Sequence, residues 1–259
     1  VRSEFLNTEL FEFEQKYVAN EYKSMFLPPP DRVSNIQLAS DKNHAWRSND
    51  GTSIILSPQL DGGFSGVLLF PRQHGVTELE TPAAVLHFFK QQYPEVAQLM
   101  SESEAAAFLN RSIARVLTVR CNRYHYGDRV LIMGDAAHSV SPSLGQGCNA
   151  ALEDVAIFDN LLNEYADDWA AAITQFTVRR IADAHALAAL SDYALPANPK
   201  LFVEFVFKQR LAEVLHRFAP NRFAQPLMGL VFNSSLPYAE ILRPYKGWIA
   251  KVKSRTSSL

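Results

Sequence analysis

The sequence predicts an α/β fold in which an antiparallel β-sheet comes first, a strand–loop–helix unit follows, and a helical region ends the chain. Two apolar runs, Ser53–Leu56 and Phe64–Phe70, flank the turn residues Asp61–Gly63, a pattern typical of a β-hairpin. A nearly continuous apolar run at Arg129–Met133 then leads through a polar loop into an amphipathic pattern that starts at about Gly147. Such a run is expected of a strand that is covered on both faces.

Composition and charge exclude several classes of protein. The chain has 259 residues, of which 47% are hydrophobic and 20% charged, as in a globular protein large enough to bury a sizeable core. Its formal net charge of -2 gives no general attraction for nucleic acid. The two cysteines, Cys121 and Cys148, make neither a disulfide framework nor a zinc cluster, so we expect an intracellular protein, cytoplasmic or organellar.

A helical stretch from about residue 82 to residue 109 follows the predicted sheet. Its apolar residues recur at helical spacing and should share one side, where they would pack on the sheet; they are Val85, Phe88, Phe89 and Tyr93. Pro94 should end or kink this helix, because proline lacks the backbone N–H that a helix interior needs. We therefore predict a second helical segment from about Glu95 to Phe108.

The remaining residues read as helices almost throughout. In the helix that starts near Gly147, apolar residues recur at spacings of three and four and predict a buried face; they are Cys148, Ala151, Val155, Phe158 and Leu162. From Trp169 onward, helical segments are separated by prolines. The last of them, from about Tyr238 to Val252, carries basic residues around an apolar stripe, and Pro244 should interrupt it.

The segment Arg129–Asp154, RVLIMGDAAHSVSPSLGQGCNAALED, carries the chemistry. Asp135 follows a strand, where ligands of α/β sheets bind, and its carboxylate can accept hydrogen bonds from polyol hydroxyls. Gly145 and Gly147 lack side chains, so backbone N–H groups can approach a flat ring closely. The helix that begins there points its positive end at the ligand, and Pro142 stiffens the loop.

The same segment resembles the second flavin-binding motif of the class A FAD-dependent flavoprotein monooxygenases, the aromatic hydroxylases. The resemblance implies FAD and NAD(P)H as cofactors, and no side-chain nucleophile or metal, so neither a catalytic residue nor a metal ligand is predicted. His138 should pack structurally in the turn. The residues predicted to bind the cofactor are Asp135, Pro142, Gly145, Gln146, Gly147, Cys148 and Asn149.

Outside the motif, the chain resembles the kynurenine 3-monooxygenase branch of that family. The resemblance is carried by Glu21-Tyr22-Lys23, His44-Ala45-Trp46, Arg180-Ile181, Asp183, His185, Tyr238 and Glu240. That branch places an Asn and a Tyr against its substrate, and the aligned positions here are Ala194 and Met228, which cannot make the same hydrogen bonds. Ser143-Leu144 replaces an aromatic pair. We therefore predict a substrate pocket, lined by these four residues, that is more apolar than the pocket of that branch or differently shaped.

No Gly-x-Gly-x-x-Gly follows a strand in this chain, and that pattern marks the half of the fold that binds the AMP part of a dinucleotide. The predicted fold is therefore FAD-binding monooxygenase-like but lacks the N-terminal Rossmann half, with an antiparallel substrate-domain sheet and a helical C-terminal part. We divide it into residues 1–120 for the partial substrate domain, 121–165 for the second FAD-binding motif and 166–259 for the helical region.

Three functions remain open. The first is a FAD-dependent monooxygenase that hydroxylates a small aromatic or apolar ring substrate with NAD(P)H and O₂, of which this segment alone is expected to be inactive. The second is kynurenine 3-monooxygenase itself. The third is a non-catalytic fragment or membrane-associated module, in which the terminal helix would bind a membrane surface weakly; the interruption at Pro244 instead favours a helix packed on its own domain.

Overall fold

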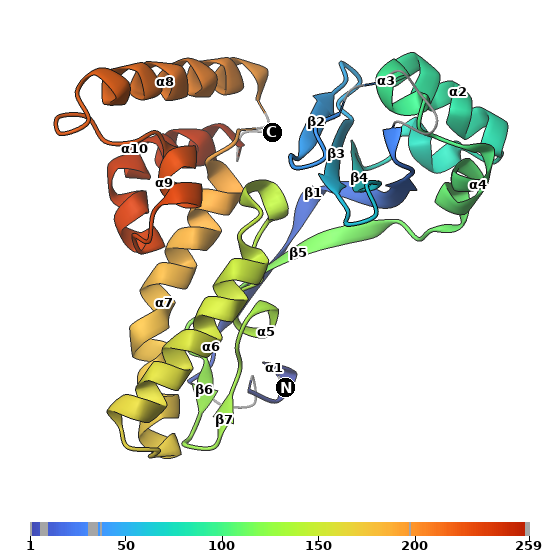
Figure 1. The fold of residues 1–259 in the computed structure, drawn as a ribbon. Coiled ribbons are helices and arrows are strands. Elements are labelled where there is room, and N and C mark those ends of the chain that lie inside the picture. Colours follow the sequence, from blue (N-terminus) through green and yellow to red (C-terminus); the bar gives the residue numbers. More distant parts are fainter. Residues whose placement is uncertain (1, 6–9, 31–35, 37, 197, 257–259) are drawn as a thin grey trace. The chain divides into compact units, whose positions relative to one another are not determined.

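The computed structural model describes residues 2–5, 10–30, 36, 38–196 and 198–256 (Figure 1). The chain separates into two compact units: Tyr17–Val116 forms one, and Val1–Lys16 together with Leu117–Leu259 forms the other. Strands β1 (Phe13–Leu27) and β5 (Ala114–Cys121) run across the two boundaries and are neighbours in one sheet. The threefold division predicted from the sequence stays a prediction.

The unit Tyr17–Val116 is built on a sheet of strand order β2-β3-β4-β1-β5, with β2 at His44–Arg47, β3 at Ser53–Pro58 and β4 at Phe64–Pro71. The predicted hairpin is confirmed, because β3 and β4 pair antiparallel from Ser53 opposite Leu69 to Pro58 opposite Phe64. Gly66 is required at its position, since a Cβ there would lie 2.3 Å from Leu56 Cδ2.

Short helices lie between β4 and β5 in the sequence: η2 (Gly75–Glu78), α2 (Pro82–Gln92), α3 (Pro94–Ala97) and α4 (Glu102–Asn110). The break at Pro94 is confirmed. The single helix predicted from Glu95 to Phe108 is wrong, because the hydroxyl of Ser101 accepts a hydrogen bond from the Glu104 N–H at 3.1 Å and starts a new helix. Serine at this position satisfies backbone donors that a continuous helix would not leave free.

One face of the sheet and the helices α2 to α4 share a single apolar core. Alternate residues of β4 point into it, as the period of a strand requires. Met25, Ile54, Leu56, Leu68, Phe70, Val85, Phe89, Val96, Ala105 and Phe108 are among its buried members. The predicted apolar side of α2 is largely confirmed, since Val85, Phe89 and Tyr93 are buried and Phe88 is half-buried.

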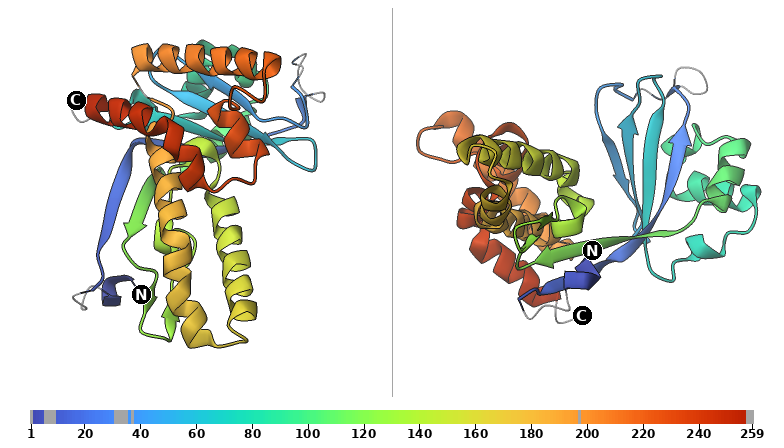
Figure 2. Two further views of the ribbon diagram at one scale, coloured as in Figure 1. Left: turned by 90° about the vertical axis from the view of Figure 1, so that its left-hand side faces the viewer. Right: turned by 90° about the horizontal axis from the view of Figure 1, so that it is seen from below.

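The second unit is mainly helical. Its elements are α1 (Arg2–Phe5), β6 (His125–Tyr126), β7 (Val130–Leu131), α5 (Asp135–His138), η3 (Pro142–Leu144), α6 (Gly147–Glu164), α7 (Trp169–Tyr193), α8 (Pro199–Phe218), α9 (Leu227–Asn233) and α10 (Tyr238–Thr256). Helices α6 and α7 run side by side, and α8 lies alongside α10 (Figure 2). The helical C-terminal region predicted from Trp169 is confirmed.

The predicted strand Arg129–Met133 is wrong in length and burial. Only Val130 and Leu131 form strand β7; they are half-buried and pair with the two residues of β6. The hairpin is short, since each strand has two residues, and the turn between them contains Gly127 at φ 56°. Beyond it the chain stays next to β6 through one bond, from Ile132 N to Tyr124 O at 2.8 Å, before it turns into α5.

The buried face of α6 differs from the predicted one. Ala150, Asp154 and Leu161 are buried, whereas Cys148 and Val155 of the predicted face are exposed. The face is rotated because a buried charged residue, Asp154, replaces an apolar one at its centre. Apolar periodicity alone cannot identify a buried carboxylate.

Pro244 does not interrupt the terminal helix, because α10 continues through it. A proline removes one backbone hydrogen bond of a helix, and the apolar side of α10 compensates by packing into its own unit. Ile241 and Ile249 are buried in one cluster with residues of α7, α8 and α9. The interpretation of this helix as one packed on its own domain is therefore confirmed, although Pro244 is not the reason.

Candidate functional site

The predicted motif forms a loop that turns back onto α6 at two glycines. Gly134 has φ 55°, and a Cβ there would lie 3.2 Å from the Cβ of Ala151, so a side chain would press on the helix. Gly145 has φ 63°, in the left-handed region that favours glycine. A Cβ at Gly145 would meet nothing within 4 Å. One glycine therefore allows close packing, and the other leaves open space beside the loop.

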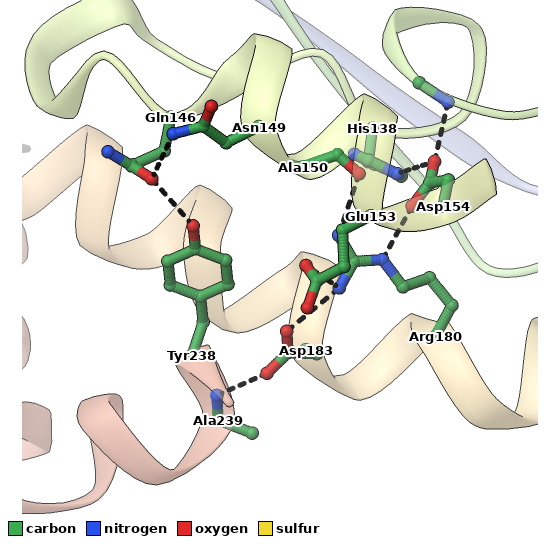
Figure 3. Close-up of polar contacts among 11 residues, drawn as sticks. His138, Gln146, Asn149, Ala150, Glu153, Asp154, Arg180, Asp183, Tyr238 and Ala239 are labelled. Atoms are coloured by element: carbon green, nitrogen blue, oxygen red, sulfur yellow. Dashed lines mark hydrogen bonds and ion pairs between the residues drawn. The ribbon is translucent and has the colours of Figure 1, made fainter. Parts of the chain in front are cut away.

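Asp154 of α6 fixes the first end of this loop (Figure 3). Its buried carboxylate accepts hydrogen bonds from the Gly134 N–H and from His138 Nε2, both at 2.7 Å, and from Arg180 Nε at 2.7 Å. Burial alone would raise the pKa of Asp154, but the hydrogen bond and charge of His138, the Gly134 N–H and Arg180 hold that pKa below its ordinary value. The carboxylate is thus kept ionised inside the protein.

Arg180 of α7 neutralises this buried carboxylate. Its side chain is 1% exposed, and its other nitrogens donate to the Ala150 carbonyl at 3.1 Å and to Asp183 at 3.0 Å. Glu153, the neighbour of Asp154, forms a further ion pair with it at 2.8 Å. Burial would lower the pKa of Arg180, but the surrounding carboxylates raise it. Each polar group of this buried cluster therefore has a partner, which such a cluster needs to be stable.

Gln146 fixes the second end of the loop, where α6 begins. It is 5% exposed, and its Oε1 accepts hydrogen bonds from the Tyr238 hydroxyl at 2.9 Å and from Asn149 Nδ2 at 3.1 Å. Its Nε2 donates to the Leu144 carbonyl at 3.3 Å. Gln146 was predicted to bind the cofactor. Its side-chain contacts suit a residue that shapes the turn, and its contact with the cofactor stays a prediction.

The first turn of α6 is open to a ligand. The side chain of Gln146, at the N-cap position, accepts no hydrogen bond from the backbone N–H groups of this turn, and Cys148 and Asn149 are exposed. Uncapped N–H groups at a helix N-terminus favour negatively charged or electron-rich groups. Pro142, which begins η3, and Asp135, which begins α5, are exposed as well. These donors, the carboxylate and the space beside Gly145 fit a flat ring that carries a polyol chain.

The four residues predicted for a substrate pocket lie in one part of the unit but are not all accessible. Leu144 and Ala194 are buried in the cluster against which Met228 packs, and Ser143 donates its hydroxyl hydrogen to the Ser191 carbonyl. Only Met228 among them lines a cavity of about 500 Å³ between α8 and α9. A substrate pocket at these residues stays a prediction.

Sequence reasoning gave no role at the site to Arg180, Asp183 or Tyr238, although all three lie among the residues that carry the family resemblance. Arg180 lies 26 positions after its carboxylate partner Asp154 in the sequence, and apolar periodicity does not indicate that the two will be buried together. His138 was expected to pack structurally. It is buried, and its imidazole hydrogen-bonds Asp154.

Comparison with known proteins decides the family. Residues 38–187, more than half of the chain, match the FAD binding domain family. The chain belongs to this family. The matched range contains the loop from Gly134 to Gly147 and its braces Asp154 and Arg180, so FAD is the cofactor that these residues have to fit. The predicted membership of the FAD-dependent monooxygenases and the predicted fold class are confirmed.

Curated relatives support the predicted branch. The chain is 30% identical to a kynurenine 3-monooxygenase of Sus scrofa over 97% of its own length and 53% of the relative's. It is 28% identical to the enzyme of Anopheles gambiae over 98% of the chain and 52% of the relative. The enzyme of Flavobacterium johnsoniae is 27% identical over 93% of the chain. The chain thus spans about half the length of the curated relatives it matches.

Solved structures share the fold. The tetrameric form of 2-methyl-3-hydroxypyridine-5-carboxylic acid oxygenase matches with a TM-score of 0.61 at 19% identity, over 85% of this chain and 57% of that one. Klebsiella pneumoniae HpxO complexed with FAD and uric acid matches with a TM-score of 0.60 at 16% identity, over 84% of this chain and 55% of that one. At these identities the likeness concerns the fold alone.

Two further findings concern the described part of the chain. Within it, no group of three or more His, Cys, Asp or Glu side chains is arranged to hold a metal ion. A search of the same residues finds no helix with the length and apolar character to cross a membrane.

Proposed function

We propose that this chain is part of a FAD-dependent monooxygenase that hydroxylates a small aromatic or apolar ring substrate with NAD(P)H and O₂. The observation that carries the proposal is the Gly134–Gly147 loop. It is braced at both ends by buried polar side chains and is open at Gly145 and at the first turn of α6. A loop fixed in this way can hold a flat ring in one position.

The residues of this loop would divide the binding of FAD between them. Asp135 would accept hydrogen bonds from the hydroxyls of the ribityl chain. The N–H groups of Gly147, Cys148 and Asn149, at the positive end of α6, would stabilise negative charge on the ring. FAD, when bound, would supply the redox chemistry, in which NAD(P)H provides two electrons, one oxygen atom of O₂ enters the substrate and the other leaves as water.

The protein's remaining task would be to position the substrate and exclude water. We assign no side chain as acid or base. The apolar character of Leu144, Ala194 and Met228 supports a substrate that carries few polar groups, because a site without hydrogen-bond partners gains nothing from them. Ser143 adds no free hydroxyl hydrogen, since it is donated to the Ser191 carbonyl.

An absorption spectrum of the protein expressed from its complete reading frame tests this function. We expect a flavin spectrum that bleaches when NADH or NADPH is added without oxygen and returns in air. A colourless protein that cannot be loaded with FAD would contradict the proposal and leave the motif as a structural element. Once reduction is established, a screen of small ring compounds for faster NAD(P)H oxidation, with product analysis, identifies the substrate.

Kynurenine is the specific substrate that the relatives' names suggest. Ala194 and Met228 argue against it, because neither can replace the hydrogen bonds expected at the aligned positions. Formation of 3-hydroxykynurenine by the full-length protein would establish this substrate. No product at saturating kynurenine, with an active flavin, would exclude it.

Association with a membrane surface is a second candidate property, and the structure favours a different helix from the predicted one. The apolar side of α10 is buried, whereas α8 exposes a stripe whose members are 47% to 84% exposed. The stripe consists of Val203, Phe207, Leu211, Val214 and Phe218, spaced by three and four residues. Basic residues of the same helix, Lys200, Arg210 and Arg217, are exposed as well.

We propose an anionic lipid surface as the occupant of this stripe, since an apolar helical face with basic residues beside it binds in the plane of such a surface. Sedimentation with phosphatidylserine vesicles tests the proposal. Phe207→Ser with Phe218→Ser should reduce binding strongly, and Val178→Ser, which alters an exposed residue of α7, should not. Equal binding of all three proteins, or no binding by the parent, would contradict it.

A further inference from the structure

The first turn of α10 is bonded to the candidate flavin loop at one point and to α7, which braces that loop, at another (Figure 3). The Tyr238 hydroxyl donates to Gln146 Oε1 at 2.9 Å. The backbone N–H of the next residue, Ala239, donates to Asp183 Oδ1 at 2.8 Å. Helix α10 begins about ninety residues after the loop, so these contacts couple two distant parts of the sequence.

The bond to Gln146 acts on the turn that starts α6. The same Gln146 oxygen also accepts from Asn149, and the Gln146 nitrogen donates to Leu144, so both of these contacts stay within the turn itself. The Tyr238 phenol reaches this amide from another helix. It therefore fixes the orientation of the Gln146 side chain, and with it the turn from Leu144 to Asn149.

The bond to Asp183 acts on the other end of the loop. Asp183 is paired with Arg180, and Arg180 holds Asp154, which in turn accepts the Gly134 N–H. Two adjacent residues of α10 therefore connect to both ends of the loop. One connection runs through Gln146, and the other runs through the buried ion pairs.

The rest of α10 gives these two contacts a fixed base. Ile241, Ile249 and Val252 are buried, and Trp248 Nε1 donates to the Ala194 carbonyl at 3.1 Å. Burial, followed by the charge of Glu153, raises the pKa of Tyr238, so its hydroxyl keeps its hydrogen as a donor at neutral pH. The phenol of Tyr238 is therefore held in one position between α10 and Gln146.

We propose that Tyr238 is a positioning residue for the flavin-binding loop, which it holds through Gln146 so that the N–H groups at the start of α6 face the ring. The proposal rests on the proposed FAD site. Tyr238 does not touch the reacting atoms in this scheme. Its loss should weaken the binding of FAD and change the surroundings of the ring while the fold is retained.

The variant Tyr238→Phe tests this role, and Tyr245→Phe is its matched control. Tyr245 lies two turns further along α10, is half-buried, and has its hydroxyl close to Gln209 of α8 and Leu227 of α9. Both variants remove one hydroxyl from one helix. In the protein expressed from its complete reading frame, we measure the Kd for FAD by titration of the apoprotein, the visible circular dichroism of the bound flavin, and the Tm.

We expect Tyr238→Phe to raise the Kd for FAD about three- to tenfold, as the loss of one hydrogen bond does, and to change the visible dichroism. Tyr245→Phe should alter the Tm to a similar degree and leave both flavin measurements as in the parent. Equal flavin measurements for Tyr238→Phe and the parent would overturn the positioning role.

The variant Gln146→Leu and the double variant that combines it with Tyr238→Phe test whether Tyr238 acts on FAD binding through Gln146. If Tyr238 acts through Gln146, the double variant binds FAD no more weakly than Gln146→Leu alone. Additive losses would overturn that route. The failure of the proposed function is distinct from these outcomes, because a parent protein that binds no FAD refutes the site itself, whereas a parent that binds FAD leaves only the role of Tyr238 in question.

Discussion

The two compact units are stabilised by different means. The unit Tyr17–Val116 has an apolar core in which strand residues such as Leu68 meet helix residues such as Phe89. Its Arg111–Glu104 ion pair lies outside that core and keeps partial exposure to solvent. In the other unit, Arg180 and Asp154 are buried, and they join the Gly134 loop to α6 and α7.

Because of this difference, one interior contributes mainly to the stability of its unit, and the other mainly fixes the position of the loop. An apolar core contributes in proportion to the area it buries, and it tolerates substitutions that conserve volume. A buried ion pair adds little net stability, but it allows only one arrangement of its donors and acceptors. The unit that carries the flavin motif has the second kind of interior, which suits a loop that must hold a ring.

Removing Arg180 should have the largest effect. Arg180→Ala leaves Asp154 buried without its charge partner, and we expect a loss of about 3–5 kcal/mol in the free energy of unfolding. Urea denaturation followed by circular dichroism measures it. Arg179→Ala is the matched control, because Arg179 is the neighbouring residue and forms an exposed pair with Glu164. That variant should lose at most about 1 kcal/mol; similar losses for both would contradict the distinction.

The apolar core should respond to volume. Leu68→Ala opens a cavity in the sheet core and should cost about 2–5 kcal/mol. Leu68→Met keeps most of the volume and should cost less than about 1.5 kcal/mol. The same denaturation experiment compares them. A methionine variant as unstable as the alanine variant would show that shape, and not volume, limits this core.

The third effect depends on pH. The pKa of Asp154 is lower in the folded protein than in an unfolded chain. Its ionisation therefore stabilises the folded state above about pH 4, the ordinary pKa of an aspartate. This stabilisation is lost as the pH falls through the lower pKa of the folded state. Asp154→Asn lacks this dependence. The stability gap between parent and variant should therefore be wider at pH 7 than near pH 3, and a constant gap would contradict the assignment.

The smallest effect concerns an unsatisfied group. Tyr124 is fully buried, and its hydroxyl has no hydrogen-bond partner among the described residues. Tyr124→Phe should therefore be neutral or stabilising by up to about 1 kcal/mol. Tyr93→Phe is the contrasting variant, because the Tyr93 hydroxyl lies 2.5 Å from Thr52 Oγ1 and its loss should destabilise. The opposite order of the two variants would show that Tyr124 has a partner in solution.

The sequence predicted those parts of the fold that local rules determine. The hairpin between β3 and β4 follows from a turn between two apolar runs, and the start of α6 at Gly147 follows from the motif. The prediction failed where a distant residue decides the outcome. The buried face of α6 is set by Arg180, which lies in the next helix, and no pattern within α6 reveals that its Asp154 will be neutralised there.

For the candidate site, the sequence likewise predicted some residues and missed others. The residues of the loop could be named because the motif fixes their spacing. The residues that brace the loop could be assigned only from the structure, since Tyr238 and Ala239 come from a helix that follows the motif by about ninety positions. The packing of α10 on its own unit was predicted, whereas the exposed apolar stripe of α8 was not, because only packing decides which apolar helix face stays exposed.

The path of the chain has a consequence for its synthesis. Residues Tyr17–Val116 form one unit without a contribution from later residues, whereas Phe5 and Phe11 are buried with Val119, Leu161 and Phe176. On the ribosome, the unit Tyr17–Val116 can complete its core first. Phe5 and Phe11 meet their partners only after more than a hundred further residues have been added, so the core of the other unit is completed later.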